Sequence, residues 1–166
     1  MATVERLGED DWVAFREIRL RSLLDSPDAF GSTYGEESSQ AEHAWRDWAG
    51  GRWRGGDAAV FAIRGENATL AGTATGAEYE AETGVAYVYA MWVAPDARGA
   101  GVGRALVEAV ADWARGRWCD RLVLNVTETN EVARRFYAAC GFAETDVREL
   151  LREGSEHDVL VLAKPL

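Results

Sequence analysis

The sequence predicts one domain of the mixed α/β class (α+β type) over residues 1–166, with about seven strands and four helices. Its length is that of a single domain and suffices to bury a core without disulfides or metals. No linker, repeat or low-complexity stretch divides the chain. Strand-like segments outnumber helix-like ones and cluster between them, which is the pattern of a mixed α/β fold.

The elements follow from hydrophobic periodicity and from turn and cap residues. We expect strands at 2–7, 58–64, 68–78, 84–94, 121–127, 142–151 and 157–164, and helices at 10–25, 38–50, 100–116 and 130–140.

Two helices and one strand carry strong signals. In 100–116 the residues Val102, Leu106, Val110 and Trp113 form one apolar stripe. Helix 130–140 is capped by Thr129 or Asn130 and is followed by Gly141, a residue suited to a left-handed helix end. Segment 85–93 has no strict polar alternation, so we expect a central strand that is covered on both faces.

Composition excludes several classes of partner. The net charge of -10 argues against nucleic-acid and anionic-membrane surfaces. The longest uncharged apolar run, Val85 to Ala94, is far shorter than the roughly 18 residues of a membrane span. The N-terminus has no basic-then-apolar signal, so we expect a cytoplasmic protein. Cys119 and Cys140 form no metal spacing with the two histidines, and we expect buried free thiols and no metal.

The segment from Met91 to Leu106 is the most informative of the chain. A strand-like run enters a turn containing Gly99, Gly101 and Gly103 and then becomes a helix, with Arg98 and Arg104 beside the turn. The first amides of a helix lack intrahelical partners and carry a partial positive charge. This arrangement predicts a site for a phosphate-bearing ligand.

Two phosphate-binding templates do not fit this segment. A P-loop requires Lys-Ser/Thr after its last glycine, where this chain has Arg104-Ala105. A Rossmann turn starting at Gly99 would require its third glycine at the position of Arg104. The pattern Arg98-x-x-Gly101-x-Gly103 after Val93-Ala94-Pro95 instead resembles the acyl-CoA pyrophosphate loop of the Gcn5-related N-acetyltransferase (GNAT) superfamily.

A second motif strengthens this resemblance. The strand 121–127, the helix from Asn130 and the ending Phe136-Tyr137-x-x-x-Gly141-Phe142 resemble the fifth strand and fourth helix of the same superfamily. The match is strong over residues 84–145. It implies a GNAT fold, a single twisted mixed central sheet whose fourth and fifth strands (84–94 and 121–127 here) splay apart into a cleft.

The resemblance also implies acetyl-CoA as co-substrate and a set of residues that bind it. The backbone of Met91, Trp92 and Val93 would bind the pantetheine, the loop amides would bind the pyrophosphate, and the last helix would line the arm. The residues carried over for the loop and the helix are Arg98, Gly99, Ala100, Gly101, Val102, Gly103, Arg104, Asn130, Ala133, Phe136 and Tyr137.

Two of these residues are expected to act in catalysis. Tyr137 matches the tyrosine that protonates the departing thiolate in many members, and a backbone N–H near Val93 would stabilise the developing oxyanion. The alternative for Tyr137 is a core tyrosine with a surface hydroxyl. Where histone-type members have a glutamate base this chain has Tyr87. A water chain to Glu36, Glu37 or Glu78, or to bulk solvent, is the alternative route for the proton.

The acceptor side is expected between the first two helices. The segment 19–37 resembles a subset of the superfamily, and Phe30, Tyr34 and Trp92 would form an aromatic wall there. The segment from Asp25 to Asp47 contains six acidic residues and only one arginine. We therefore expect Glu36 and Glu37 to attract a cationic acceptor. A solvated helix face is the competing interpretation of the acidic stretch.

Together these features predict an N-acetyltransferase that acts on the primary amine of a small molecule by direct attack in a ternary complex. Acetylation of a protein lysine or N-terminus and non-catalytic acyl-CoA binding remain the alternatives. Homodimers are common in the superfamily, and the apolar segment Val159-Leu160-Val161-Leu162 could contribute to one.

Overall fold

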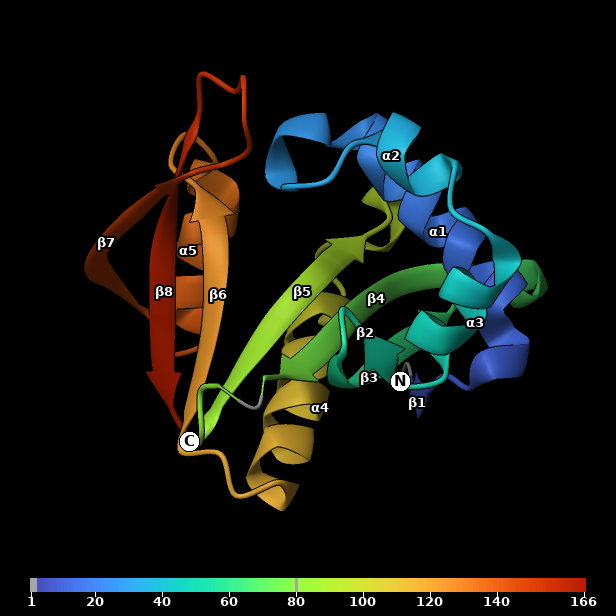
Figure 1. The fold of residues 1–166 in the computed structure, drawn as a ribbon, viewed down its shortest axis with the longest axis horizontal. Coiled ribbons are helices and arrows are strands. Elements are labelled where there is room, and N and C mark those ends of the chain that lie inside the picture. The colour runs from blue at the N-terminus through green and yellow to red at the C-terminus, as the bar shows by residue number, and fades with distance from the viewer. Residues whose placement is uncertain (1–2, 80) are drawn as a thin grey trace.

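The computed structural model describes residues 3–79 and 81–166, which form one mixed sheet of eight strands (Figure 1). The strand order is β1-β3-β4-β5-β6-β8-β7, and β2 pairs with β3 outside this path. The strands are β1 (Val4–Arg6), β2 (Arg52–Trp53), β3 (Gly56–Arg64), β4 (Leu70–Glu78), β5 (Val85–Val93), β6 (Arg121–Thr127), β7 (Ala143–Leu150) and β8 (Asp158–Pro165). The α-helices are α1 (Trp12–Asp25), α2 (Tyr34–Ser38), α3 (Glu42–Ala49), α4 (Val102–Gly116) and α5 (Glu131–Ala139).

Each expected strand and helix lies in the structure close to its predicted bounds. Sequence analysis missed β2, with two residues, and α2, with five, because so few residues show no periodicity. The predicted helix 38–50 begins only at Glu42. Among the described residues no helix is long and apolar enough to cross a membrane.

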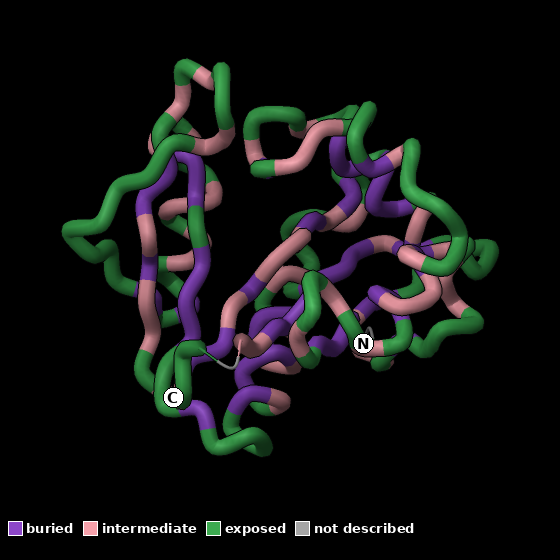
Figure 2. Tube along the Cα trace, in the orientation of Figure 1, coloured by how far each residue is buried: buried purple, intermediate pink, exposed green. Residues whose placement is uncertain are grey.

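The sheet separates two hydrophobic cores. On β3, Val60 and Ala62 join the core under α1 and α3, whereas Ile63 and the half-buried Phe61 join the core under α4. Successive side chains of a strand point to opposite faces, so α4 covers one face and α1 and α3 cover the other. Figure 1 shows this arrangement, and Figure 2 shows the buried strand centres between the helices.

The sheet divides between β5 and β6. These two strands run parallel and pair only from Val85 opposite Arg121 to Tyr87 opposite Val123, although both continue for several residues. Figure 1 shows them diverging beyond that point. The splay expected between the strands at 84–94 and 121–127 is therefore confirmed, and it leaves the edge of β5 beyond Tyr87 without a neighbouring strand.

Strand β5 also contains a bulge. Its pairing with β4 changes register between Thr73 opposite Trp92 and Thr75 opposite Tyr89, so Ala90 and Met91 together face a single residue of β4. Ala90 has φ +51°, in the left-handed region that alanine rarely adopts. The strand is central, as predicted, but Tyr87, Tyr89 and Met91 are only half-buried.

Candidate active site

The turn before α4 has the backbone of an anion-binding helix start. Gly99 and Gly101 have φ of +78° and +81°, and a Cβ atom added at either would meet nothing within 4 Å. Gly101 is the N-cap residue of α4. Glycine is therefore required here by the left-handed backbone, and the space before the first amides of α4 is open.

The two arginines of the turn bind backbone carbonyls. Arg98 Nε donates to the carbonyl of Val93 at 2.9 Å, and its Nη2 lies 3.4 Å from Asp25 Oδ2. Arg104 Nη2 donates to the carbonyl of Ala139 at 3.1 Å, near the end of α5. The two arginine side chains thus stabilise the loop through hydrogen bonds to backbone carbonyls. The amides at the start of α4 remain available to donate hydrogen bonds to a ligand.

Gly103 brings α4 close to α5. A Cβ at Gly103 would lie 2.9 Å from Phe136 Cζ and 3.4 Å from Met91 Cε, so a larger residue would push these side chains away. Asn130 caps α5 by accepting from the amide of Ala133 at 3.1 Å, which confirms the predicted cap. Residues expected to line one cofactor arm therefore gather at the open side of β5.

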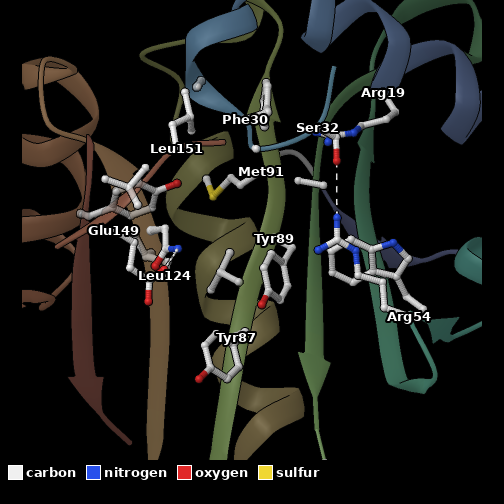
Figure 3. Close-up of a pocket in the computed structure, with 18 of the residues that line it drawn as sticks. Arg19, Phe30, Ser32, Arg54, Tyr87, Tyr89, Met91, Leu124, Glu149 and Leu151 are labelled. Carbon is white, nitrogen blue, oxygen red and sulfur yellow. Dashed lines mark hydrogen bonds between the residues drawn. The ribbon is translucent and has the colours of Figure 1, made fainter. Parts of the chain in front are cut away.

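A pocket of about 310 Å³ opens in the splay (Figure 3). It lies between β5 on one side, β6, β7 and α5 on another, and the segments after α1 and β2 on a third. Its lining includes five aromatic residues and one methionine, namely Phe30, Trp53, Tyr87, Tyr89, Tyr137 and Met91. Phe30, Met91 and Tyr137 were expected at the site, whereas sequence analysis did not single out Trp53 or Tyr89.

Tyr137 belongs to both the pocket and the core. Its ring packs edge-on against Phe136, with centroids 5.1 Å apart, and against Phe142, at 5.8 Å. Burial raises the pKa of the Tyr137 hydroxyl above its ordinary value of 10.0. The Tyr137 hydroxyl is therefore protonated at neutral pH and holds a proton at the pocket.

Tyr87 and Tyr89 stack on each other along β5 with ring centroids 5.8 Å apart. The Tyr87 hydroxyl donates a hydrogen bond to Glu82. Burial, aided by that bond, raises the pKa of Tyr87 to about 12, and burial also raises the pKa of Tyr89. The position that holds a glutamate base in histone-type members thus carries a neutral hydroxyl here.

The acids expected at the acceptor mouth have other partners. Glu37 is buried and paired with Arg19, and Glu36 accepts from the amide of Thr33 at 2.9 Å as part of a capping box at α2. Glu78 is paired with Arg117. None of the three lines the pocket, so the structure does not support the predicted acidic rim.

The predicted aromatic wall is also incorrect in part. Trp92 is 6% exposed in the core under α1, and its Nε1 donates to Asp25 Oδ2 at 3.2 Å. Tyr34, the first residue of α2, lines a separate apolar surface pocket along α1. Only Phe30 of the three expected residues lines the pocket, because the side of β5 on which Trp92 lies is covered by α1.

The two cysteines lie outside the pocket lining. Cys119 and Cys140 are buried free thiols, and burial raises the pKa of each above 9.0. A nucleophilic cysteine requires an accessible thiolate. Neither residue offers one.

Comparison with known proteins identifies the family of this arrangement. A mycothiol acetyltransferase from Thermobispora bispora is 30% identical over 148 residues, covering 87% of this chain and 46% of that protein. This chain thus spans less than half the length of that relative. A streptothricin acetyltransferase from Streptomyces lavendulae is 33% identical over 147 residues, covering 87% of this chain and 70% of that one.

The fold also matches solved structures. A GCN5-related N-acetyltransferase from Kribbella flavida superposes with a TM-score of 0.71 at 24% identity, covering 99% of this chain and 98% of the other. Residues 12–142 match the family described as acetyltransferase (GNAT) family. That span contains the glycine turn, the splayed strands and the helix of Tyr137, and the chain therefore belongs to the acetyltransferase (GNAT) family.

Proposed function

We propose that the protein transfers an acetyl group from acetyl-CoA to the primary amine of a small molecule, by direct attack in a ternary complex. One observation carries this proposal. Met91, whose Cε would lie 3.4 Å from a Cβ at Gly103 in the first turn of α4, lines the pocket in the splay together with Tyr137. An anionic cofactor and an acceptor can therefore approach one point from opposite ends of the same opening.

Acetyl-CoA, when bound, supplies a thioester. The amides at the start of α4 would bind its pyrophosphate, and the unpaired edge of β5 from Met91 to Val93 would hydrogen-bond its arm. Asn130, Ala133 and Phe136 would line the arm from α5. The side chains of Arg98 and Arg104 would hold the loop that presents these amides.

The transfer forms one C–N bond and breaks one C–S bond. The neutral amine attacks the thioester carbonyl, a backbone N–H near Val93 stabilises the developing oxyanion, and Tyr137 gives its proton to the departing sulfur. The amine nitrogen releases one proton to water, and Tyr137 is reprotonated from solvent. Removing the proton from a lysine-like ammonium at pH 7.4 costs about 4 kcal/mol, which this proposal assigns to equilibrium with bulk water.

The size and closure of the pocket favour a small acceptor over a polypeptide. A volume of about 310 Å³ lies at the lower end of the range for small-molecule sites. The names of the relatives, mycothiol and streptothricin acetyltransferases, agree with an acceptor of that class. We further propose that residues 1–166 form one acetyltransferase domain that acts in the cytoplasm without membrane or nucleic-acid partners, and a homodimer is to be tested by measuring the mass in solution.

Acetyl-CoA turnover with a panel of small amines tests this function. Thiol release should depend on both the amine and the enzyme, and mass spectrometry should find the acetyl group on the amine nitrogen. Binding of acetyl-CoA without turnover of any amine would favour a non-catalytic acyl-CoA-binding domain. Turnover restricted to peptides would favour a protein acetyltransferase.

A further inference from the structure

The acceptor pocket has a positive and a negative wall. Arg54, in the turn between β2 and β3, lies at one side of β5, and Glu149, near the end of β7, lies at the other (Figure 3). Tyr87 and Tyr89 of β5 lie between them. We propose that the acceptor is zwitterionic, with its amine held toward Glu149 and a carboxylate or phosphate held at Arg54. This inference rests on the proposed acetyl transfer and names its substrate class.

Arg54 is positioned as a fixed cation. Its guanidinium carbon lies 4.4 Å above the ring of Trp53, and Nη2 donates to Ser32 Oγ at 3.4 Å. Within residues 3–79 and 81–166, no carboxylate lies within 4 Å of its guanidinium nitrogens. Two groups thus orient the side chain, the Trp53 ring and the Ser32 hydroxyl, and neither of them neutralises its charge.

A second guanidinium at this wall has an unused donor. Arg19 lines the pocket and is 4% exposed, with Cζ 4.5 Å from the centre of the Phe30 ring. Its Nε and Nη2 donate to Glu37, but Nη1 is buried without a hydrogen-bond partner among the described residues. An orphaned buried donor is costly, and a ligand oxygen at this wall would satisfy it.

Glu149 supplies the opposite charge. Its Oε2 accepts from Asn125 Nδ2 of β6 at 3.4 Å, which holds the carboxylate toward the pocket. In the part of the chain that the structure describes, no arginine or lysine pairs with it. An ammonium entering beside Tyr87 would therefore find a carboxylate that is not neutralised.

The two walls discriminate between amines by charge. A polycation would be attracted by Glu149 but repelled by Arg54. An amine that also carries an anionic group would find a residue of opposite charge at each end. Opposite charges attract each other more strongly in a partly enclosed pocket than in bulk water, because the effective dielectric constant is lower there. The partly enclosed pocket thus favours a substrate whose charges are separated along the line from Glu149 to Arg54.

Matched amines test this inference. 4-Aminobutanoate and propylamine differ only in a carboxylate, as do 6-aminohexanoate and pentylamine, and both acids carry their two charges on opposite ends of the molecule. For the full-length protein we expect kcat/KM to be at least tenfold higher for the carboxylate-bearing member, about 1.4 kcal/mol. Arg54→Gln should abolish this preference. Arg52→Gln, a neighbour paired with Asp47 and absent from this pocket, should retain it.

Calorimetric binding to the complex with CoA gives a readout independent of turnover. The wild-type protein should bind 4-aminobutanoate more tightly than propylamine, and Arg54→Gln should remove the difference. Equal or tighter binding of the carboxylate-free amine, or a preference that survives in Arg54→Gln, would overturn the zwitterion assignment. Amine turnover with such a result would leave the acetyl transfer standing, whereas the absence of turnover of any amine would overturn the transfer itself.

Discussion

Glu37 accepts two hydrogen bonds of 2.7 Å from Arg19, and both side chains are 4% exposed. Arg19 projects from α1 beneath Phe30, while Glu37 projects from α2. The pair therefore ties the short helix α2 to α1 and supports the segment around Phe30 that lines the pocket. The Glu37 carboxylate therefore stabilises the fold, and its charge is neutralised by Arg19.

Replacing Glu37 should destabilise the protein far more than replacing its neighbour. Glu37→Gln leaves the Arg19 charge buried without a counter-ion, which costs about 3–5 kcal/mol of unfolding free energy. Glu36→Gln keeps a side-chain oxygen that can accept from the Thr33 amide, so a loss of less than about 1 kcal/mol is expected. Urea unfolding of both variants compares them directly. Equal losses would show that the buried pair contributes no more than the exposed cap.

Gly101→Val should weaken the binding of CoA. The left-handed φ of +81° disfavours valine by about 1–2 kcal/mol, and the side chain would occupy the open space before the α4 amides. We expect the dissociation constant to rise at least tenfold, about 1.4 kcal/mol. Titration calorimetry measures it, with Gly116→Val at the other end of α4 as the control. Unchanged affinity in a folded Gly101→Val protein would remove the turn from the cofactor site.

Tyr137→Phe should reduce catalysis and spare binding. Loss of the hydroxyl removes the proposed proton donor, so kcat should fall about 100-fold or more while acetyl-CoA affinity stays nearly constant. Tyr34→Phe, at the separate surface pocket along α1, is the matched control and should behave as wild type. Turnover at the wild-type rate in Tyr137→Phe would transfer the acid role to water or to another residue.

The pH profile should show the effect of burial on Tyr137. Because burial raises the pKa of this hydroxyl above its ordinary value of 10.0, the proton donor stays protonated through the neutral range and beyond. Activity should therefore increase with pH as the amine loses its proton, without decreasing below about pH 10. Steady-state kcat between pH 6 and 10 checks this. A decrease in kcat between pH 8 and 9 in a protein that remains folded would contradict the assignment.

Asp25→Asn should lower stability in a pH-dependent way. Hydrogen bonds from Ser26 and then from Trp92, together with the Arg98 charge, hold the pKa of Asp25 below its ordinary value of 3.8. A lowered folded-state pKa adds stability that is complete above the unfolded value and is lost as pH falls through the folded value. The difference in Tm between wild type and Asp25→Asn should thus be full at pH 7 and shrink below pH 3.8. A difference that is constant from pH 7 to 3 would exclude charge as the cause.

Local signals in the sequence predicted the backbone features around the glycine turn and helix α5, where we propose that the cofactor binds. The glycine turn before α4, the cap at Asn130 and the left-handed Gly141 depend on neighbouring backbone, so the sequence alone locates them. The burial of Tyr137 beside Phe136 and Phe142 follows from the same helix periodicity. These features involve residues only a few positions apart.

The acceptor side could not be predicted in the same way. Glu37 is buried only because α2 packs on α1, and Arg54 reaches the pocket only because β2 pairs with β3. Glu149 lies at the pocket because β7 joins the sheet beyond β8, in the order β6-β8-β7. Contacts between distant segments leave no periodicity in the chain, so charge counts along the sequence selected the wrong acids.

The bulge of β5 separates the path of the main chain from the alternation of the side chains, which are coupled in an ordinary strand. With Ala90 omitted, Val88, Met91 and Val93 face the α4 core and Tyr89 and Trp92 face the other side, in unbroken alternation. Ala90 is therefore an inserted position that alters the path of the main chain without exchanging the faces of the side chains. A one-residue deletion there would keep the chemical pattern of the strand while straightening its free edge, and so would isolate what backbone shape alone contributes to the opening.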